Sequence, residues 1–369
     1  MNPRGADHRE PSHGEVLSAA MDWIEQAHDV TGRQGISAGY DLHKGWLPAY
    51  PETSGYSIPT LLRAAEALRR PELAVRAHEV AGWLQRIQLP DGSFPGGVGT
   101  GGAPVVFDVG QIMQGLLDLW HVTNSQSIMD SLGRAADWLR SVQDADGAWR
   151  SHAFLRYANT YSSRVTWSVA RLWLVTGNQA HLECAQRSVD WMLSQVQPDG
   201  WIDRMAFDDD ETPYTHTIAY TLRGLLRCGD ILGGEIGERC VDAATRAALR
   251  LADIRTSLYP LLPGEIGPGF RPMADYACLT GDAQMVTVWL DIAHRHPELH
   301  DRAEITLRRL VATQVRQPVE PAVVGALPGS WPLTGRYQAL GFPNWASKFL
   351  ADAVLNTESE RVRQPRATA

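Results

Sequence analysis

The chain has 369 residues, a length that allows either one large domain or two ordinary ones. Apolar residues make up 44% and charged residues 21%, as in globular proteins, and no run of about eighteen apolar residues could span a bilayer. The formal charge of −8 disfavours nucleic acid as a partner, because nucleic-acid-binding proteins carry a basic face. We therefore expect a cytoplasmic globular protein without membrane insertion.

The two ends of the chain differ from its middle in composition. Residues 1–13 are polar and lack the apolar segment of a secretory signal, and residues 358–369 are also polar. We expect a disordered lead-in over 1–13, one domain over 14–357 and a disordered tail over 358–369. The cysteines show no CxxC spacing, so we expect reduced thiols packed in helices rather than a zinc site. They are Cys184, Cys228, Cys240 and Cys278.

Three segments repeat one pattern. Each has an amphipathic helix with Trp-Leu or Trp-Met on its apolar face, then a glutamine, an Asp-Gly turn and an aromatic residue. The segments are residues 77–94, 133–149 and 186–202. Their glutamines Gln88, Gln143 and Gln197 are 55 and 54 residues apart, a period that suits two helices with their connections. Glycine fits such turns because it accepts positive φ without steric cost, and we interpret the turns as fasteners of the fold.

Twelve helices are predicted along the chain. In order, they cover residues 14–31, 56–69, 72–89, 108–122, 126–143, 161–176, 179–197, 215–232, 236–251, 276–293, 298–316 and 343–356. The first helix and every second one after it are charged on one side, as surface helices are, whereas the others are richer in Gly, Ser, Thr and aromatic residues. Gly177 and Gly233 follow helices, and Pro71 and Pro297 lie at helix starts. Six exposed helices alternating with six buried ones predict an all-α (α/α)6 barrel, closed by pairing of the last helix with the first.

The longer loops all precede buried helices, so they converge on one rim, where a rigid scaffold presents them around a cavity. Polar or aromatic residues occur at nearly every helix entry, and we expect a site there for a small molecule or a polymer. The expected substrate-binding residues are Trp46, Tyr56, Tyr161, Arg164, Asp275, Trp331, Asn344 and Trp345. The expected catalytic residues are His216, Tyr220, Glu52, Asp108, Asp209 and Asp210.

Two of these expectations rest on helical position. His216 and Tyr220 are four residues apart in one predicted helix and share a face. If that face is inward, the pair can remove and deliver protons on opposite sides of a carbon; otherwise it is a core histidine with a packed tyrosine. Arg164 lies near the start of a buried helix, where an isolated cation is costly. It either pairs with a carboxylate such as Asp108 or receives an anionic group of a ligand.

The acidic residues allow several interpretations. Glu52 and Asp108 form a candidate carboxylate pair for acid/base chemistry on a glycosidic bond. The acidic run 208–211 is either a solvated loop before a helix or the source of a proton donor. Asp275 and Cys278 have a spacing compatible with a metal, but no third ligand accompanies them. We therefore expect neither a metal nor another cofactor.

The segment RAADWLRSVQDADGAW resembles the QW repeat of the squalene cyclase and protein prenyltransferase superfamily, with Gln143, Gly147 and Trp149 at the motif positions. Residues 88–94 give a weaker copy. The resemblance implies an (α/α)6 toroid. Class II terpene cyclases of that superfamily use a DxDD acid, which residues 208–211 match only loosely because the last position is glutamate. The spacing of Asp275 does not match the zinc ligands of the prenyltransferases.

The same ring serves carbohydrate enzymes, among them unsaturated glucuronyl hydrolases, N-acylglucosamine epimerases and the helical domains of uronate lyases and C5-epimerases. The helix entries YPETSGY, VVFDVGQ, SSRVTWS, THTIAY and CLTGDAQ also resemble uncharacterised toroid proteins associated with bacterial polysaccharide loci. A single ring of this length fits the sugar enzymes better than the triterpene cyclases, which use two helical domains in a longer chain. The rim is also rich in Arg, Asp, Asn and His.

Three functions follow from these observations. The leading hypothesis is a carbohydrate-active enzyme that acts on an acidic, uronate-type saccharide by elimination, epimerisation or hydrolysis. The second is a terpenoid cyclase or prenyl-chain enzyme with an acidic proton donor. The third is a non-catalytic toroid that binds a saccharide or a protein partner. The substrate, the bond that changes and the oligomeric state stay open at this point.

Overall fold

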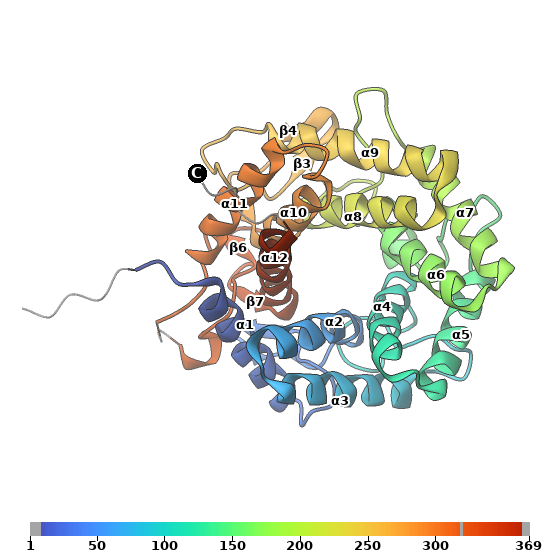
Figure 1. Ribbon diagram of the computed structural model, residues 1–369, viewed down its shortest axis with the longest axis horizontal. Coiled ribbons are helices and arrows are strands. Elements are labelled where there is room, and N and C mark those ends of the chain that lie inside the picture. Colours follow the sequence, from blue (N-terminus) through green and yellow to red (C-terminus); the bar gives the residue numbers. More distant parts are fainter. Residues whose placement is uncertain (1–8, 318–319, 364–369) are drawn as a thin grey trace, which may run out of the picture.

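The computed structural model describes residues 9–317 and 320–363, and within these ranges twelve α-helices alternate between an outer and an inner layer (Figure 1). The outer helices are α1 (His13–Asp29), α3 (Pro71–Ile87), α5 (Gln126–Ser141), α7 (Gln179–Leu193), α9 (Gly234–Ala252) and α11 (Glu298–Val311). The inner helices are α2 (Pro51–Leu68), α4 (Val106–Thr123), α6 (Ser163–Thr176), α8 (Thr215–Leu232), α10 (Leu279–Ile292) and α12 (Asn344–Arg363). The predicted all-α (α/α)6 barrel is confirmed.

The ring closes through its inner layer. Each inner helix contacts the next, and α12 contacts both α10 and α2 (Figure 1). The outer helix α1 packs mainly against α12, as predicted, while α3, α5, α7, α9 and α11 each pack on the inner helix that precedes them. Small residues allow the inner helices to approach: a Cβ on Gly115 would lie 1.9 Å from the backbone oxygen of Gly55. This explains the glycine content of the inner series.

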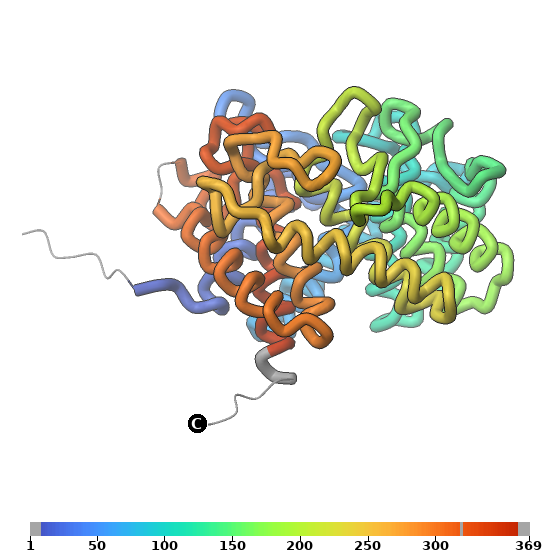
Figure 2. The backbone as a smooth tube through the Cα atoms, turned by 90° about the horizontal axis from the view of Figure 1, so that it is seen from above, coloured from blue at the N-terminus to red at the C-terminus, as the bar shows by residue number. Residues whose placement is uncertain are grey.

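The two faces of the ring differ in their connections (Figure 2). Short turns join each inner helix to the next outer helix at one face, where Pro71 occupies the first turn of α3 and Gly177 caps α6 in the left-handed conformation. The long loops lie at the opposite face. Because every inner helix starts from a long loop, the six inner N-termini all point to that face, and the functional site is expected there.

Short strands tie the long loops together. They are β1 (Gly39–Asp41), β2 (Gly45–Trp46), β3 (Ile266–Gly267), β4 (Arg271–Pro272), β5 (Ala277–Cys278), β6 (Ser330–Trp331) and β7 (Gly341–Pro343). They form antiparallel sheets of order β2-β1-β7, β3-β4 and β5-β6. Tyr40 pairs with Phe342, so the first sheet links the two ends of the chain where the ring closes.

Two of the three glutamine turns act as the predicted fasteners. The Nε2 of Gln143, just after α5, donates to the backbone oxygens of Gly147 (2.9 Å) and of Cys184 in α7 (3.0 Å). The Nε2 of Gln88 likewise donates to Gly92 (2.9 Å) and to Ser131 in α5 (2.9 Å). Each of these glutamines therefore holds the end of one outer helix against the next outer helix. At the third turn, the Nε2 of Gln197 donates to the Oδ2 of Asp203 at 2.5 Å instead of to the next outer helix.

A further fastener of the same kind was not recognised in the sequence. The Nε2 of Gln314, after α11, donates to the backbone oxygens of Gly325 (3.0 Å) and of Val16 in α1 (3.1 Å). A Cβ on Gly325 would lie 2.1 Å from the backbone oxygen of Ala19, the same close approach that Gly147 makes to Arg187. Eleven residues rather than four separate this glutamine from its glycine, which hid the repeat at the point of ring closure.

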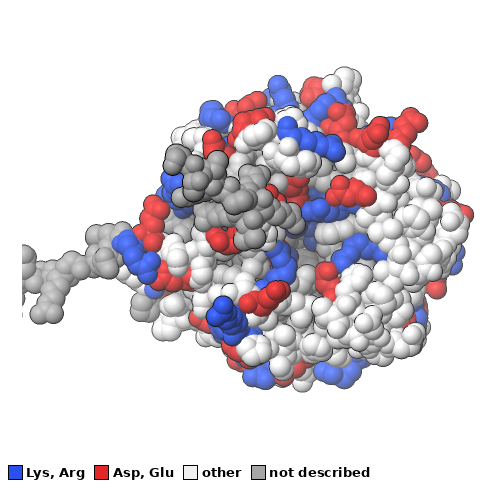
Figure 3. Space-filling model, in the orientation of Figure 1, with Lys and Arg blue, Asp and Glu red and all other residues white. Residues whose placement is uncertain are grey.

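Ion pairs join inner helices at the short-turn face, where Figure 3 shows a central hollow edged by charges of both signs. An Nη of Arg171 in α6 lies 2.8 Å from an Oδ of Asp118 in α4, and an Nη of Arg227 in α8 lies 2.5 Å from an Oδ of Asp291 in α10. The Nη2 of Arg63 in α2 donates to Asn356 in α12 at 2.7 Å. Arginines near inner-helix C-termini also suit the helix dipoles.

The ends of the chain differ partly from expectation. Helix α1 begins at His13 with Ser12 and Glu15 in a capping box, close to the predicted start. Helix α12 continues to Arg363, so residues 358–363 are helical where a tail was predicted. The Nδ1 of His13 lies 2.5 Å from an oxygen of Glu358, which places this extension beside α1. Residues 1–8 and 364–369 of the predicted lead-in and tail lie outside the described residues.

Two further expectations concern the cysteines and membrane insertion. All four cysteines are buried and none forms a disulfide, and three of them lie in helices whereas Cys278 lies in β5. No helix within residues 9–317 and 320–363 is both long and apolar enough to cross a membrane.

Candidate active site

A cavity of about 460 Å³ lies at the long-loop face. Its walls come from the N-terminal ends of α2, α4, α8 and α12, from the loops before them and from the loop before α6. Seven of the predicted site residues line it: Glu52, Tyr56, Asp108, Tyr161, His216, Tyr220 and Trp345. The first and the last of these residues, Glu52 and Trp345, lie almost three hundred positions apart in the chain. The structure thus brings half of the predicted set into one place.

The site is built from equivalent helix positions. Glu52 is the second residue of α2, His216 the second of α8, Trp345 the second of α12 and Asp108 the third of α4. Because the inner helices are parallel around the ring, their first turns meet at the cavity. The positive ends of the helix dipoles meet there as well, and they favour negative charge. The cavity lining itself includes no lysine or arginine.

Aromatic side chains form most of the cavity wall. Phe107 contacts Tyr161 and Tyr220 with ring centroids 5.1 Å apart in each case. The indole nitrogen of Trp345 donates to the Tyr337 hydroxyl at 2.8 Å. Tyr50, Phe107 and Tyr337 line the cavity but were not among the predicted residues. Tyr50 directly precedes α2 and Phe107 neighbours Asp108, so closeness to a helix entry was the signal available in the sequence.

The two carboxyls of the cavity are buried. Burial raises the pKa of Asp108 to about 7, although the backbone N–H of Gly97 donates to its Oδ2 at 2.8 Å and favours the ionised form. Burial, with repulsion from Asp108, raises the pKa of Glu52 well above its usual range. The pair therefore retains at least one proton at neutral pH. Gly97 belongs to the glycine-rich loop 96–102, of which residues 96–98 line the cavity.

His216 and Tyr220 occupy one face of α8, and that face is inward. Their ring centroids are 4.3 Å apart. Burial lowers the pKa of His216 to about 3, so the imidazole is neutral. Its Nδ1 lies 2.7 Å from the Oε1 of Gln284 in α10. The Tyr220 hydroxyl is buried and interacts with the hydroxyl of Tyr56.

Arg164 lies behind the cavity wall rather than in it. Its guanidinium is 4.7 Å from the centroid of the Tyr220 ring, and its Nε and Nη2 donate to the side-chain oxygens of Gln111 (2.7 Å) and Gln114 (3.0 Å). It is 2% exposed and forms no ion pair with Asp108 or any other described carboxylate. Its Nη1 has no partner among the described residues. Asp352 and Glu52 act on this buried cation from beyond ion-pair distance.

Three further predicted residues, two tryptophans and an asparagine, lie outside the cavity lining. Trp46 packs on Trp23, with ring centroids 5.5 Å apart, and lies outside the cavity lining. Asn344 donates to the backbone oxygen of Ser37 (2.7 Å) and to the Thr53 hydroxyl (2.8 Å), which anchors the start of α12. Trp331 is 41% exposed in β6.

Three predicted acidic residues are exposed. Asp209 and Asp210 lie in the loop before α8, and Asp275 lies before β5; none of them lines the cavity. The neighbouring Glu211 faces Arg336, whose Nη2 is 3.5 Å from its carboxylate. The geometry agrees with the solvated-loop interpretation of residues 208–211. Within the described residues no three His, Cys, Asp or Glu side chains cluster as a metal site would require.

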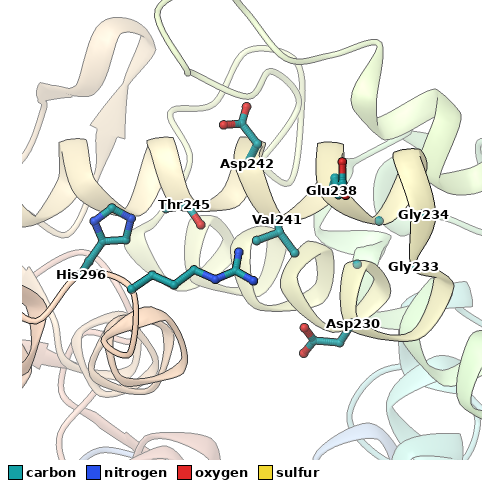
Figure 4. A pocket seen from close by; sticks show the side chains of 11 residues that line it. Asp230, Gly233, Gly234, Glu238, Val241, Asp242, Thr245 and His296 are labelled. Atoms are coloured by element: carbon teal, nitrogen blue, oxygen red, sulfur yellow. The ribbon is translucent and has the colours of Figure 1, made fainter.

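A second cavity, of about 400 Å³, lies away from the predicted residues (Figure 4). It is formed where α8 meets α9 and by the turn after α10. Figure 4 shows Asp230, Glu238, Asp242 and His296 around it. Its three carboxylates are exposed, whereas Glu52 and Asp108 in the long-loop cavity are buried, so the long-loop cavity is the better candidate for a catalytic site.

Part of the sequence and the whole fold are similar to those of known proteins. Residues 51–225 match the family model of the squalene-hopene cyclase C-terminal domain. No curated protein matches the sequence. An unsaturated glucuronyl hydrolase specific for heparin superposes with a TM-score of 0.74 at 13% identity, over 95% of this chain and 98% of that one.

Two further solved structures have a similar fold. The unsaturated glucuronyl hydrolase of Bacillus sp. GL1 superposes with a TM-score of 0.74 at 14% identity, covering 95% of this chain and 97% of that one. A glycosyl hydrolase family 88 protein of Bacteroides vulgatus gives 0.67 at 11% identity, covering 96% and 99%. The chain therefore has the (α/α)6 toroid fold, and its residues 51–225 are similar to the squalene-hopene cyclase C-terminal domain.

Proposed function

We propose that the chain is a carbohydrate-active enzyme that acts on an acidic, uronate-type saccharide by elimination, epimerisation or hydrolysis. The observation that carries the proposal is the buried carboxyl pair Glu52 and Asp108 in an aromatic-walled cavity. Structures that share this ring over at least 95% of the chain include unsaturated glucuronyl hydrolases and a polysaccharide lyase, which supports the same class of substrate.

The surroundings of the cavity favour an anionic substrate. Arg164 lies behind Tyr220 with no carboxylate of the described residues at ion-pair distance, and the first turns of four inner helices meet at the cavity. In a medium of low dielectric constant, such positive charge attracts a carboxylate more strongly than in water. Aromatic faces such as those of Trp345 and Tyr56 supply flat apolar surface against which a sugar ring can pack. We assign the recognition of the sugar carboxylate to this field.

The reacting groups are assigned from their protonation. The carboxyl pair keeps a proton at neutral pH and acts as the acid, donating to a leaving oxygen or to a carbon. The ionised member of the pair, or the neutral His216, accepts a proton from water or from the substrate. Tyr220, which lines the cavity beside Tyr56, orients a substrate hydroxyl.

A panel of uronate-containing oligosaccharides, some with an unsaturated terminal residue, tests the proposal by mass spectrometry and NMR of the products. We expect turnover by the parent protein and a loss of about 10²- to 10⁴-fold in Asp108→Asn and Glu52→Gln. Asp209→Ala serves as the matched control at an exposed carboxylate and should stay active. Binding without turnover would indicate a non-catalytic toroid, and neither binding nor turnover across the panel would refute the proposal.

A terpenoid cyclase is the second candidate, favoured by the family match over residues 51–225 and by the aromatic wall. Aromatic faces stabilise carbocations, and a protonated carboxyl can start cyclisation. The proton donor would be Asp108 or Glu52, because Asp209 and Asp210 are exposed outside the cavity. Incubation with squalene and linear polyprenyl substrates would then yield cyclised products, and these would disappear in Asp108→Asn but persist in Asp209→Ala.

A further inference from the structure

We propose that Gln284 is a positioning residue that holds His216 in the tautomer with hydrogen on Nδ1, so that the lone pair of Nε2 faces the cavity. The inference rests on the proposed function in one respect, namely that His216 accepts a hydrogen bond or proton from the substrate. Gln284 itself does not line the cavity. It would act entirely through the histidine.

The contact is short and enclosed. The His216 Nδ1 lies 2.7 Å from the Gln284 Oε1, and the two residues are 6% and 1% exposed. An amide oxygen can only accept a hydrogen bond, so the hydrogen of this contact is on Nδ1. A neutral imidazole carries one hydrogen, which leaves Nε2 as an acceptor. Nε2 forms no hydrogen bond with any described residue, while the ring lines the cavity.

Neighbouring rings restrict the orientation of the imidazole. The His216 ring centroid is 4.3 Å from that of Tyr220 and 5.5 Å from that of Tyr337. Packed on these sides, the ring cannot readily turn over to exchange its two nitrogens. The tautomer of His216 therefore depends on whether Gln284 presents a hydrogen-bond acceptor or a donor to Nδ1. An amide NH₂ in place of the oxygen would reverse the assignment and direct Nε2–H to the cavity.

The chain builds this contact through a close approach of α10 to α8. A Cβ on Gly281 would lie 2.6 Å from the backbone nitrogen of His216 and 2.7 Å from the carbonyl carbon of Thr215. The approach thus requires glycine at this position. Gln284 follows three residues later, close to one helical turn, on the same side of α10. His216 lies in the segment THTIAY and Gln284 in the segment CLTGDAQ, so the two segments together form this hydrogen bond.

The tautomer complements the carboxyl pair. Glu52 and Asp108 retain a proton that they can donate, and His216 presents an acceptor to the same cavity. A substrate held between them meets a donor and an acceptor, as acid/base chemistry requires. With the other tautomer, His216 would present N–H instead, and no uncharged acceptor nitrogen would remain in the lining.

Nitrogen-15 NMR of the full chain labelled in its histidines tests the inference without any substrate. His216 is assigned from the signals lost in His216→Phe. In the parent we expect a protonated Nδ1 and an unprotonated Nε2 at neutral pH. Gln284→Leu removes the acceptor and should give a mixture of tautomers, whereas Gln284→Glu keeps an acceptor and should restore the Nδ1–H form. Gln314→Leu, a change of a buried glutamine far from the site, should leave the His216 signals unchanged.

The outcomes separate this inference from the proposed function. A His216 with hydrogen on Nε2 in the parent, or an Nδ1–H population unchanged in Gln284→Leu, overturns it. If Gln284→Leu does not fold, Gln284→Met provides the same test with a flexible apolar chain. On a saccharide that the parent turns over, kcat should fall about 10- to 100-fold in Gln284→Leu with little change in KM. Absence of any turnover would refute the proposed function while leaving the NMR result to stand.

Discussion

Alanine substitutions at the glycines of the three repeats should destabilise the ring to different degrees. Gly147 has φ +92°, and a Cβ there would lie 2.1 Å from the backbone oxygen of Arg187 in the next outer helix. Gly92 has φ +94°, with the corresponding oxygen of Arg134 at 2.3 Å. At Gly200 φ is +89°, but the nearest atom, the Cβ of Arg246, is 3.5 Å away. The backbone penalty is therefore shared, whereas the clash is confined to the first two positions.

These distances set the expected magnitudes. A left-handed alanine costs about 1–2 kcal/mol. Overpacking against a backbone oxygen adds about 1–3 kcal/mol, which brings Gly147→Ala and Gly92→Ala to roughly 2–5 kcal/mol. A chain of 369 residues has an unfolding entropy of roughly 0.8 kcal/mol per degree. We thus expect Tm to fall by about 3–6 °C in these two variants and by about 1–3 °C in Gly200→Ala.

Differential scanning calorimetry at one protein concentration measures the series, with Gly133→Ala as the matched control. Gly133 lies within α5, and a Cβ there meets no atom within 4 Å. Alanine should raise Tm by about 1 °C at that position, because glycine inside a helix costs about 0.5–1 kcal/mol. Equal losses at all three repeats would show that contact with the next helix contributes nothing, and no loss at Gly147 would refute the fastener interpretation.

Three further predictions concern single side chains. Burial raises the pKa of Asp108 in the folded protein from 3.8 to about 7. The free energy of unfolding therefore falls as pH rises from about 4 to 7, because the unfolded chain loses this proton first. Asp108→Asn should be more stable than the parent at pH 8 by up to about 4 kcal/mol. The advantage should vanish near pH 4 in thermal melts, and a gain independent of pH would contradict the assignment. Arg164→Met should weaken binding of an acidic saccharide about tenfold or more by calorimetry, with a neutral analogue unaffected; equal losses for both would argue against a charge effect. Gln314→Leu removes two hydrogen bonds at the ring closure and should lower Tm by about 2–3 °C, which a melt unchanged within error would disprove.

The helices were predictable because their signals are local. Helix α8 was expected over 215–232 and is observed there, since apolar periodicity and the following Gly233 are both read within a few residues. The same holds for the first two glutamine turns, where glutamine and glycine are four residues apart. The ring order follows once twelve alternating helices are recognised.

The site was predictable only in part. Glu52, Asp108, His216 and Trp345 each lie at the start of an inner helix, and parallel inner helices must bring such positions together. Side chains farther from the helix starts could not be placed in this way. Trp46 packs on Trp23 instead of lining the cavity, because the turn between β1 and β2 decides its direction.

By itself, the sequence determined an all-helical ring, two of its fasteners and the rim that carries the candidate site, because each depends on periodicity or on turn chemistry over a few residues. Only the tertiary structure decided the partners of the buried groups. Arg164 proved to contact two glutamines and a tyrosine ring rather than a carboxylate, and His216 proved to contact Gln284 across 68 residues. Such partners are set by how closely whole helices approach, and that distance depends on packing summed over the entire ring.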